Sequence, residues 1–153
     1  RPALSEQPME PPSSAEMRAF AYRLLGRREY SVLELDRRIR QKWPEAEGVG
    51  ELVATLEAEN LVCDQRFTES FVRSRIQRHQ GPLKIRAELR ARGVSDSLIE
   101  RELGGYAEQW TSLAREWLQR QIELPAEFDQ KKKYYRRLQS RGFTHDQAMD
   151  ALG

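Results

Sequence analysis

The sequence predicts an all-α protein of three tandem three-helix repeats that form an elongated, curved, solenoid-like molecule. The first observation is an internal repeat, because residues 90–95 return 49 positions later as residues 139–144 with the Arg-Gly pair kept in both copies. The second is the helical spacing of apolar residues, and the third is the lack of any alternating β-branched run of strand length. Helical repeats of about 45 to 50 residues stack on one another to share a core, and 153 residues accommodate three of them.

The predicted domain organisation is a flexible tail followed by the three repeats. Four of the seven prolines stand in the first twelve residues among serines, and such a composition buries too little apolar surface to order itself. We therefore expect a tail at 1–14 and three-helix repeats at 15–62, 63–107 and 108–153.

Each repeat is expected to open with a long helix whose apolar residues recur three and four positions apart. These stripes are Phe20, Leu24 and Leu25; Phe67, Phe71, Val72 and Ile76; and Trp110, Leu113, Ala114, Trp117 and Leu118. A second helix follows in each repeat, predicted from an apolar pair four positions apart. The pairs are Leu35 and Ile39, Ile85 and Leu89, and Tyr134 and Leu138.

The third helices are expected to be short and to begin after a repeated turn. Ser95 and Thr144 can cap these helices, because a hydroxyl oxygen accepts a hydrogen bond from an otherwise unpaired backbone N–H. Gly93 and Gly142 can adopt the positive φ that ends the preceding helix. The first repeat has a Trp-Pro pair in place of this turn, as is common in a terminal repeat.

Charge is segregated along the chain, although the net charge is only +2. Residues 66–92 hold eight basic and two acidic side chains, and residues 130–141 hold six basic side chains and no acid, so each segment carries +6. Residues 44–64 hold six acids and no base, which gives −6. Such segregation produces strong local fields that steer an acidic protein surface or a phosphate backbone.

The basic segments predict a partner-binding strip formed by the second helices of the last two repeats. For any single cation, an ordinary solvated helix face is the simpler interpretation. For the two segments together a binding role is favoured, because neighbouring like charges on one helix repel. The candidate partner-binding residues are Arg73, Arg75, Arg78, Lys84, Arg86, Arg90, Lys131, Lys132, Lys133, Arg136 and Arg137.

The sequence offers little that supports catalysis. His79, His145 and Cys63 do not stand at metal-ligand or nucleophile–base spacings, and no glycine-rich phosphate loop occurs. We therefore predict a non-enzyme with no catalytic, cofactor-binding or metal-binding residues. The single cysteine and the lack of a long apolar run favour a cytoplasmic protein that neither spans nor binds a membrane, and a monomer is expected.

Three motifs stand in fixed order in the middle of the chain. They are Leu-Val-Cys-Asp-Gln-Arg-Phe at 61–67, Phe-Val-Arg-Ser-Arg at 71–75, and Gly-Pro-Leu-Lys-Ile-Arg-Ala-Glu-Leu-Arg-Ala-Arg-Gly-Val at 81–94. Together with residues 21–31 and 135–143 they resemble the RecX family of bacterial regulatory proteins, over about residues 15–153. Cys63 and Thr68 depart from the family pattern, which bears on capping and packing more than on the partner.

The resemblance implies a chain of three-helix repeats that binds the recombinase RecA in the groove of its filament on single-stranded DNA. It also implies inhibition of RecA's ATP hydrolysis, strand exchange and coprotease activity, and so a role in homologous recombination, DNA repair and the SOS response. The alternative is a helical nucleic-acid-binding module whose basic strip contacts single-stranded DNA directly. Tyr135 is the one aromatic residue among these cations expected at the surface, where a base could stack.

Overall fold

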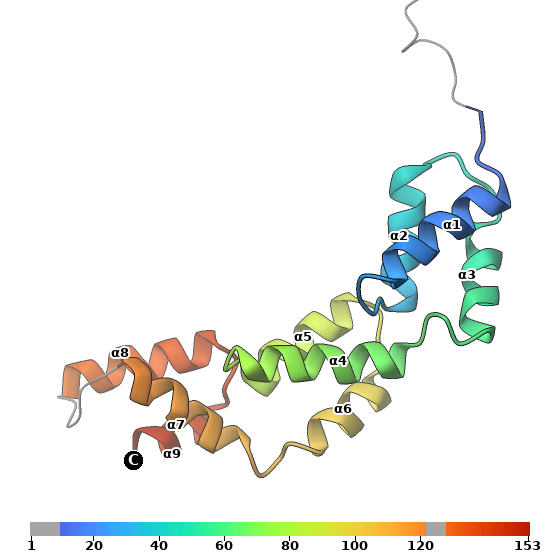
Figure 1. Cartoon of the computed structure of the whole chain (residues 1–153). Helices are drawn as coiled ribbons and strands as arrows, with labels where there is room; N and C mark the ends of the chain where they lie inside the picture. The colour runs from blue at the N-terminus through green and yellow to red at the C-terminus, as the bar shows by residue number, and fades with distance from the viewer. Residues whose placement is uncertain (1–9, 122–127) are drawn as a thin grey trace, which may run out of the picture. The chain divides into compact units, whose positions relative to one another are not determined.

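The computed structural model describes residues 10–121 and 128–153 (Figure 1). These residues form nine α-helices and no strand, so the predicted all-α fold class is confirmed for the part of the chain that is described. The chain divides into two compact units, unit 1 at residues 1–64 and unit 2 at residues 65–153. Unit 2 therefore spans nearly all of the two repeats predicted at 63–107 and 108–153.

Unit 1 is built from α1 (Ser14–Leu25), α2 (Val32–Lys42) and α3 (Val49–Ala58). Its core contains Leu35 and Ile39, the apolar pair predicted on the second helix, and neither side chain is exposed to solvent. The rest of the core comes from α1, α3 and the segments that flank the helices: Met17, Phe20, Ala21, Leu24, Tyr30, Val49, Leu52, Val53, Leu56 and Val62.

The first helix of unit 1 begins one residue inside the predicted tail. The side chain of Ser13 accepts a hydrogen bond from the backbone N–H of Glu16 at 3.1 Å, which satisfies one of the unpaired donors of the first turn. The helix therefore starts at Ser14. Most of the predicted tail, residues 1–9, lies outside the described residues.

Unit 2 contains two groups of three helices. The first group is α4 (Asp64–Gln77), α5 (Pro82–Ala91) and α6 (Asp96–Gly104), and the second is α7 (Trp110–Gln121), α8 (Phe128–Ser140) and α9 (His145–Leu152). The two groups centre on two apolar clusters, and Trp110 at the start of α7 packs into the cluster of the first group. The predicted second-helix pairs lie in them: Ile85 and Leu89 are fully buried, as is Leu138, and Tyr134 is 8% exposed.

The predicted turns before the short third helices are also confirmed. Gly93 and Gly142 have φ values of 80° and 98°, in the left-handed region that favours glycine. The hydroxyls of Ser95 and Thr144 then accept hydrogen bonds from the backbone N–H groups of Leu98 and Gln147, at 3.3 and 3.1 Å. The Gln147 side chain in turn accepts from the N–H of Thr144, which completes a capping box.

The second of these turns also joins the two helix groups of unit 2. The backbone N–H groups of Gly81 and Leu83 donate to the carbonyls of Arg141 and Gly142, at 2.7 and 2.9 Å. These donors lie at the start of α5, where a helix leaves its N–H groups unpaired, so the turn of one repeat caps a helix of the repeat before it. A Cβ on Gly142 would lie 2.6 Å from the backbone nitrogen of Lys84, so this approach excludes any side chain at position 142.

Candidate partner-binding surface

The eleven candidate residues lie on three helices of unit 2 or directly after one of them, and the structure shows which of these cations pair with acids. Arg73 and Arg75 belong to α4, and Arg78 follows that helix directly. The others lie on α5 (Lys84, Arg86 and Arg90) and on α8 (Lys131, Lys132, Lys133, Arg136 and Arg137).

Two of the α5 cations pair with acids of α6. The guanidinium of Arg86 contacts both carboxylate oxygens of Glu100, with Nε–Oε1 at 2.5 Å and a second contact at 3.1 Å. This two-point contact lowers the pKa of Glu100 and raises that of Arg86. Arg90 Nε lies 2.7 Å from Asp96 Oδ1. Both cations therefore tie α5 to α6.

Arg75 is also occupied within the fold. Its side chain is only 17% exposed, and its Nε lies 3.1 Å from Oε2 of Glu88 on α5. The guanidinium groups of Arg75 and Arg92 lie over the ring of Phe71, at 4.3 and 4.8 Å from its centre. Arg75 thus packs α4 against α5, and it is poorly placed to meet a partner.

Three candidates of the first helix group remain exposed without an acidic neighbour. Arg73, Arg78 and Lys84 are exposed, and no ion pair joins any of them to another described residue. They add three positive charges to the surface around α4 and α5.

Helix α8 carries the largest group of available cations. All five of its candidate residues are exposed. Within residues 10–121 and 128–153, Lys131, Lys133, Arg136 and Arg137 form no ion pair. Lys133 and Arg137 lie over the ring of buried Tyr134, at 5.9 and 5.5 Å, which orients their charged ends without neutralising them.

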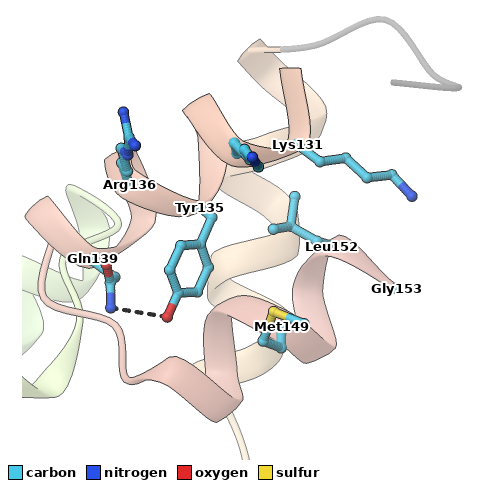
Figure 2. Close-up of a pocket in the computed structure, with 8 residues that line it drawn as sticks. Lys131, Tyr135, Arg136, Gln139, Met149, Leu152 and Gly153 are labelled. Carbon is cyan, nitrogen blue, oxygen red and sulfur yellow. Dashed lines mark hydrogen bonds between the residues drawn. The ribbon is translucent and has the colours of Figure 1, made fainter. Parts of the chain in front are cut away.

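A groove of about 560 Å³ lies beside these cations, between α8 and α9 (Figure 2). Its α8 side carries the ring of Tyr135, and its α9 side carries Met149 and Leu152. Met149 is 52% exposed, although it is one of the largest apolar side chains in α9. The lining residues that the structure describes include no Asp or Glu: Lys131, Lys132, Tyr135, Arg136, Gln139, Met149, Leu152 and Gly153.

Two hydrogen bonds hold the Tyr135 side chain in this groove. The side-chain amide of Gln139 donates to the Tyr135 hydroxyl at 3.0 Å, as the dashed line in Figure 2 shows. The same hydroxyl lies 2.5 Å from Nδ1 of His145, to which it can donate its own hydrogen. The hydroxyl is satisfied at both contacts, so the ring stays fixed against the groove.

Sequence reasoning identified Tyr135 as a surface residue but missed the apolar side of the groove. Met149 and Leu152 belong to an ordinary-looking amphipathic helix, and only the packing of α9 shows which of its apolar residues is left uncovered. The sequence held one signal: Met149 is not one of the apolar positions that the last two repeats share.

Arg141 closes the basic stretch at 130–141 but faces the interior. Its guanidinium donates to the backbone oxygen of His79 at 2.9 Å and to that of Arg78, and it lies 5.2 Å from the ring centre of Trp117. Burial lowers the pKa of this group. Arg141 therefore fastens the two helix groups of unit 2 together and contributes little to the exposed strip.

The remaining chemistry of the described residues is sparse. No group of three or more His, Cys, Asp or Glu side chains in residues 10–121 and 128–153 is placed to hold a metal ion. None of the helices in those ranges combines the length and the apolar character needed to cross a bilayer. The arrangement can thus offer charge and an apolar groove to a partner.

Comparison with known proteins identifies the family. Residues 64–103 match the family model described as the second three-helix domain of RecX. The regulatory protein RecX of Chromohalobacter salexigens is 42% identical over 90% of this chain and 91% of its own length, and that of Halorhodospira halophila is 37% identical over 91% and 88%. The crystal structure of RecX from Lactobacillus salivarius superposes with a TM-score of 0.76 at 19% identity, covering 91% of this chain and 94% of that one. The chain therefore belongs to the RecX family of regulatory proteins.

Proposed function

We propose that this protein binds the RecA recombinase and its filament on single-stranded DNA, and that it inhibits RecA's ATPase, strand-exchange and coprotease activities. In the cytoplasm it would thereby restrain homologous recombination, DNA repair and the SOS response. Membership of a family of regulatory proteins carries the proposal, since relatives of 37–42% identity cover about nine-tenths of the chain.

The surface of unit 2 supports a macromolecular partner. The unpaired cations of α8 lie next to an exposed apolar groove, and interface cores commonly combine apolar residues with a charged rim. Arg73, Arg78 and Lys84 extend the positive charge onto the other helix group of the same unit. An acidic face of a protein filament is complementary to this arrangement.

The test is a titration of the protein into RecA that is hydrolysing ATP on single-stranded DNA at physiological salt. A parallel titration measures binding of the protein to the same DNA without RecA. Inhibition well below the concentration that coats the bare DNA is expected. Absence of inhibition at any concentration would refute the proposal.

Direct binding to single-stranded DNA is the second candidate, favoured by the α8 cations and by the fixed ring of Tyr135. Salt separates the two functions, because contacts to phosphates release counterions. Affinity for bare single-stranded DNA would then fall with log salt at a slope of about 0.7 per phosphate contact. Inhibition of RecA that begins only when the DNA is coated would favour this second function.

A further inference from the structure

We propose that the groove between α8 and α9 binds an acidic segment of the protein partner and holds one apolar side chain of that segment against Tyr135, Met149 and Leu152. This inference names the chemistry of the partner's contact and rests on the proposed function, in which the partner is a protein. The groove volume of about 560 Å³ lies within the range typical of binding pockets.

The apolar part of the argument begins with exposure. Met149 is half exposed in a helix whose other apolar residues, such as fully buried Ala148, contribute to the core. An exposed methionine adapts its shape to different partners because its side chain is unbranched and polarizable. An uncovered apolar floor rimmed by polar groups is typical of an interaction site.

The charge of the rim selects the kind of segment. Lys131 and Arg136 are exposed and unpaired among the described residues, and the described part of the groove lining includes no Asp or Glu. A neutral or basic segment would leave these cations uncompensated, whereas aspartate or glutamate beside the apolar anchor would pair with them. Charge complementarity therefore favours an acidic segment.

The same lining argues against single-stranded DNA as the occupant. Sites for single strands follow the backbone with several aromatic rings on which successive bases stack. Among the described residues of the groove lining, Tyr135 is the only aromatic one, while Tyr134 and Phe143 are 8% and 1% exposed and serve the core. The side chains of Met149 and Leu152 instead provide an apolar floor that suits an aliphatic side chain of a protein segment.

The Tyr135 ring is preorganised, because its side chain is held in place before the partner binds. Gln139 and His145 both contact its hydroxyl, so little side-chain freedom remains to be lost on binding. The ring and Met149 can then contact the anchor from the two helices.

The experiment is an NMR titration of the full chain labelled with ¹³C at the methionine methyl groups. The probe is a short peptide of aspartates and glutamates around one central leucine, compared with the same peptide carrying serine at the centre. We expect the Met149 methyl signal to shift saturably with the leucine peptide, and the serine peptide to bind about tenfold or more weakly. Met17 is 3% exposed in unit 1 and serves as the internal control that does not shift.

Charge variants complete the design. The double variant Lys131→Glu with Arg136→Glu should weaken leucine-peptide binding about tenfold or more, whereas Arg101→Glu, an exposed cation of α6, should leave it unchanged. Helical circular dichroism verifies that each variant is folded. Equal affinity for the two peptides, no shift with either of them, or displacement of the peptide by an oligothymidylate of higher affinity would each overturn the proposal.

A second readout separates this inference from the proposed function. Met149→Gln should weaken inhibition of RecA's ATPase, and Met149→Leu, which keeps the apolar floor, should retain it. Full inhibition by Met149→Gln would refute the proposed role of the groove, while RecA would remain the proposed partner. If the unmodified protein fails to inhibit RecA, the proposed function fails, and the peptide titration still decides whether the groove binds an acidic segment.

Discussion

Arg86 and Glu100 illustrate at the scale of single residues why charge along the chain was an incomplete guide to the surface. Arg75, Arg86 and Arg90 were candidates because each belongs to a basic segment, yet each lies beside an acid of its own repeat. Arg86 and Glu100 stand 14 positions apart in the chain, and the packing of α5 against α6 brings them together. Burial and capping were easier to predict, because they depend on local spacing.

The Arg86–Glu100 contact has a measurable consequence for titration. Because the guanidinium donates to both oxygens of the charged carboxylate, the pKa of Glu100 lies below its ordinary value of 4.5 in the folded protein. We expect Arg86→Gln to raise this pKa toward its ordinary value, measured from side-chain carboxyl ¹³C shifts against pH. Lys84→Gln, which removes an exposed cation from the same helix, should leave the Glu100 titration unchanged.

The sign of the accompanying stability effect follows from linkage. A carboxyl whose pKa is lower in the folded state stabilises that state above the unfolded pKa, and this contribution is lost as the pH falls through the folded pKa. Glu100 is 52% exposed, so solvent screening limits the contribution to less than about 1 kcal/mol. A pKa of Glu100 that does not respond to Arg86→Gln would contradict the assigned cause.

At the scale of elements, the Arg-Gly turn has a role that its sequence did not reveal. The repeated turn predicted a helix end and a helix start, and both are present. It did not predict that the turn before α9 would receive hydrogen bonds from the start of α5. That contact depends on how the two helix groups of unit 2 stack, which is a tertiary property.

Gly142→Ala tests this joint. The substitution places a Cβ against the backbone of Lys84 and demands φ near 98° from an alanine, so we expect unit 2 to lose at least about 2 kcal/mol of stability. Gly48→Ala is the matched control, because Gly48 has φ of 77° but a Cβ there would meet no atom within 4 Å. Its cost should stay near about 1 kcal/mol.

The measurement is urea denaturation followed by circular dichroism, with amide exchange of Gly81 and Leu83 as the local readout. Faster exchange of these two amides in Gly142→Ala, and unchanged exchange in Gly48→Ala, is the expected pattern. Similar destabilisation by the two variants would show that backbone strain alone, and not the close approach, makes glycine necessary at position 142.

Repulsion between the cations of α8 disfavours the helix. Lys132 and Lys133 stand four residues before Arg136 and Arg137, a spacing at which like charges on a helix repel. We expect the variant that reverses Lys132, Arg136 and Arg137 to glutamate to stay folded, with its helical circular dichroism signal intact. The same variant should inhibit RecA's ATPase about tenfold or more weakly.

A matched variant distinguishes this surface from a general effect of charge. Reversal of Arg27, Arg101 and Arg120, which are exposed cations outside α8, changes the net charge equally and should leave inhibition unchanged. Full inhibition by the α8 variant, measured by ATPase titration at physiological salt, would remove these residues from the partner-binding surface.

At the scale of the whole molecule, the sequence predicted three helix groups, while the compact units number two. The repeat period shows how the chain is built, but cooperativity depends on how many contacts join neighbouring groups. The hydrogen bonds of Gly81 and Leu83 and the partly buried guanidinium of Arg141 join the last two groups. These contacts involve backbone atoms and a single arginine, so no periodic pattern of the sequence predicts them.

The two units should therefore unfold as separate cooperative elements. Ile39 in α2 and Leu138 in α8 are fully buried at corresponding positions of their second helices, so Ile39→Ala and Leu138→Ala should each cost about 2–5 kcal/mol. Hydrogen exchange measured by mass spectrometry should then accelerate in α1, α2 and α3 for Ile39→Ala, and in α4 through α9 for Leu138→Ala. Because α4 to α6 share a unit with Leu138, their acceleration is the critical observation. If Leu138→Ala accelerates exchange only in α7, α8 and α9, each repeat unfolds by itself; if either variant affects the whole chain, the protein behaves as one cooperative domain.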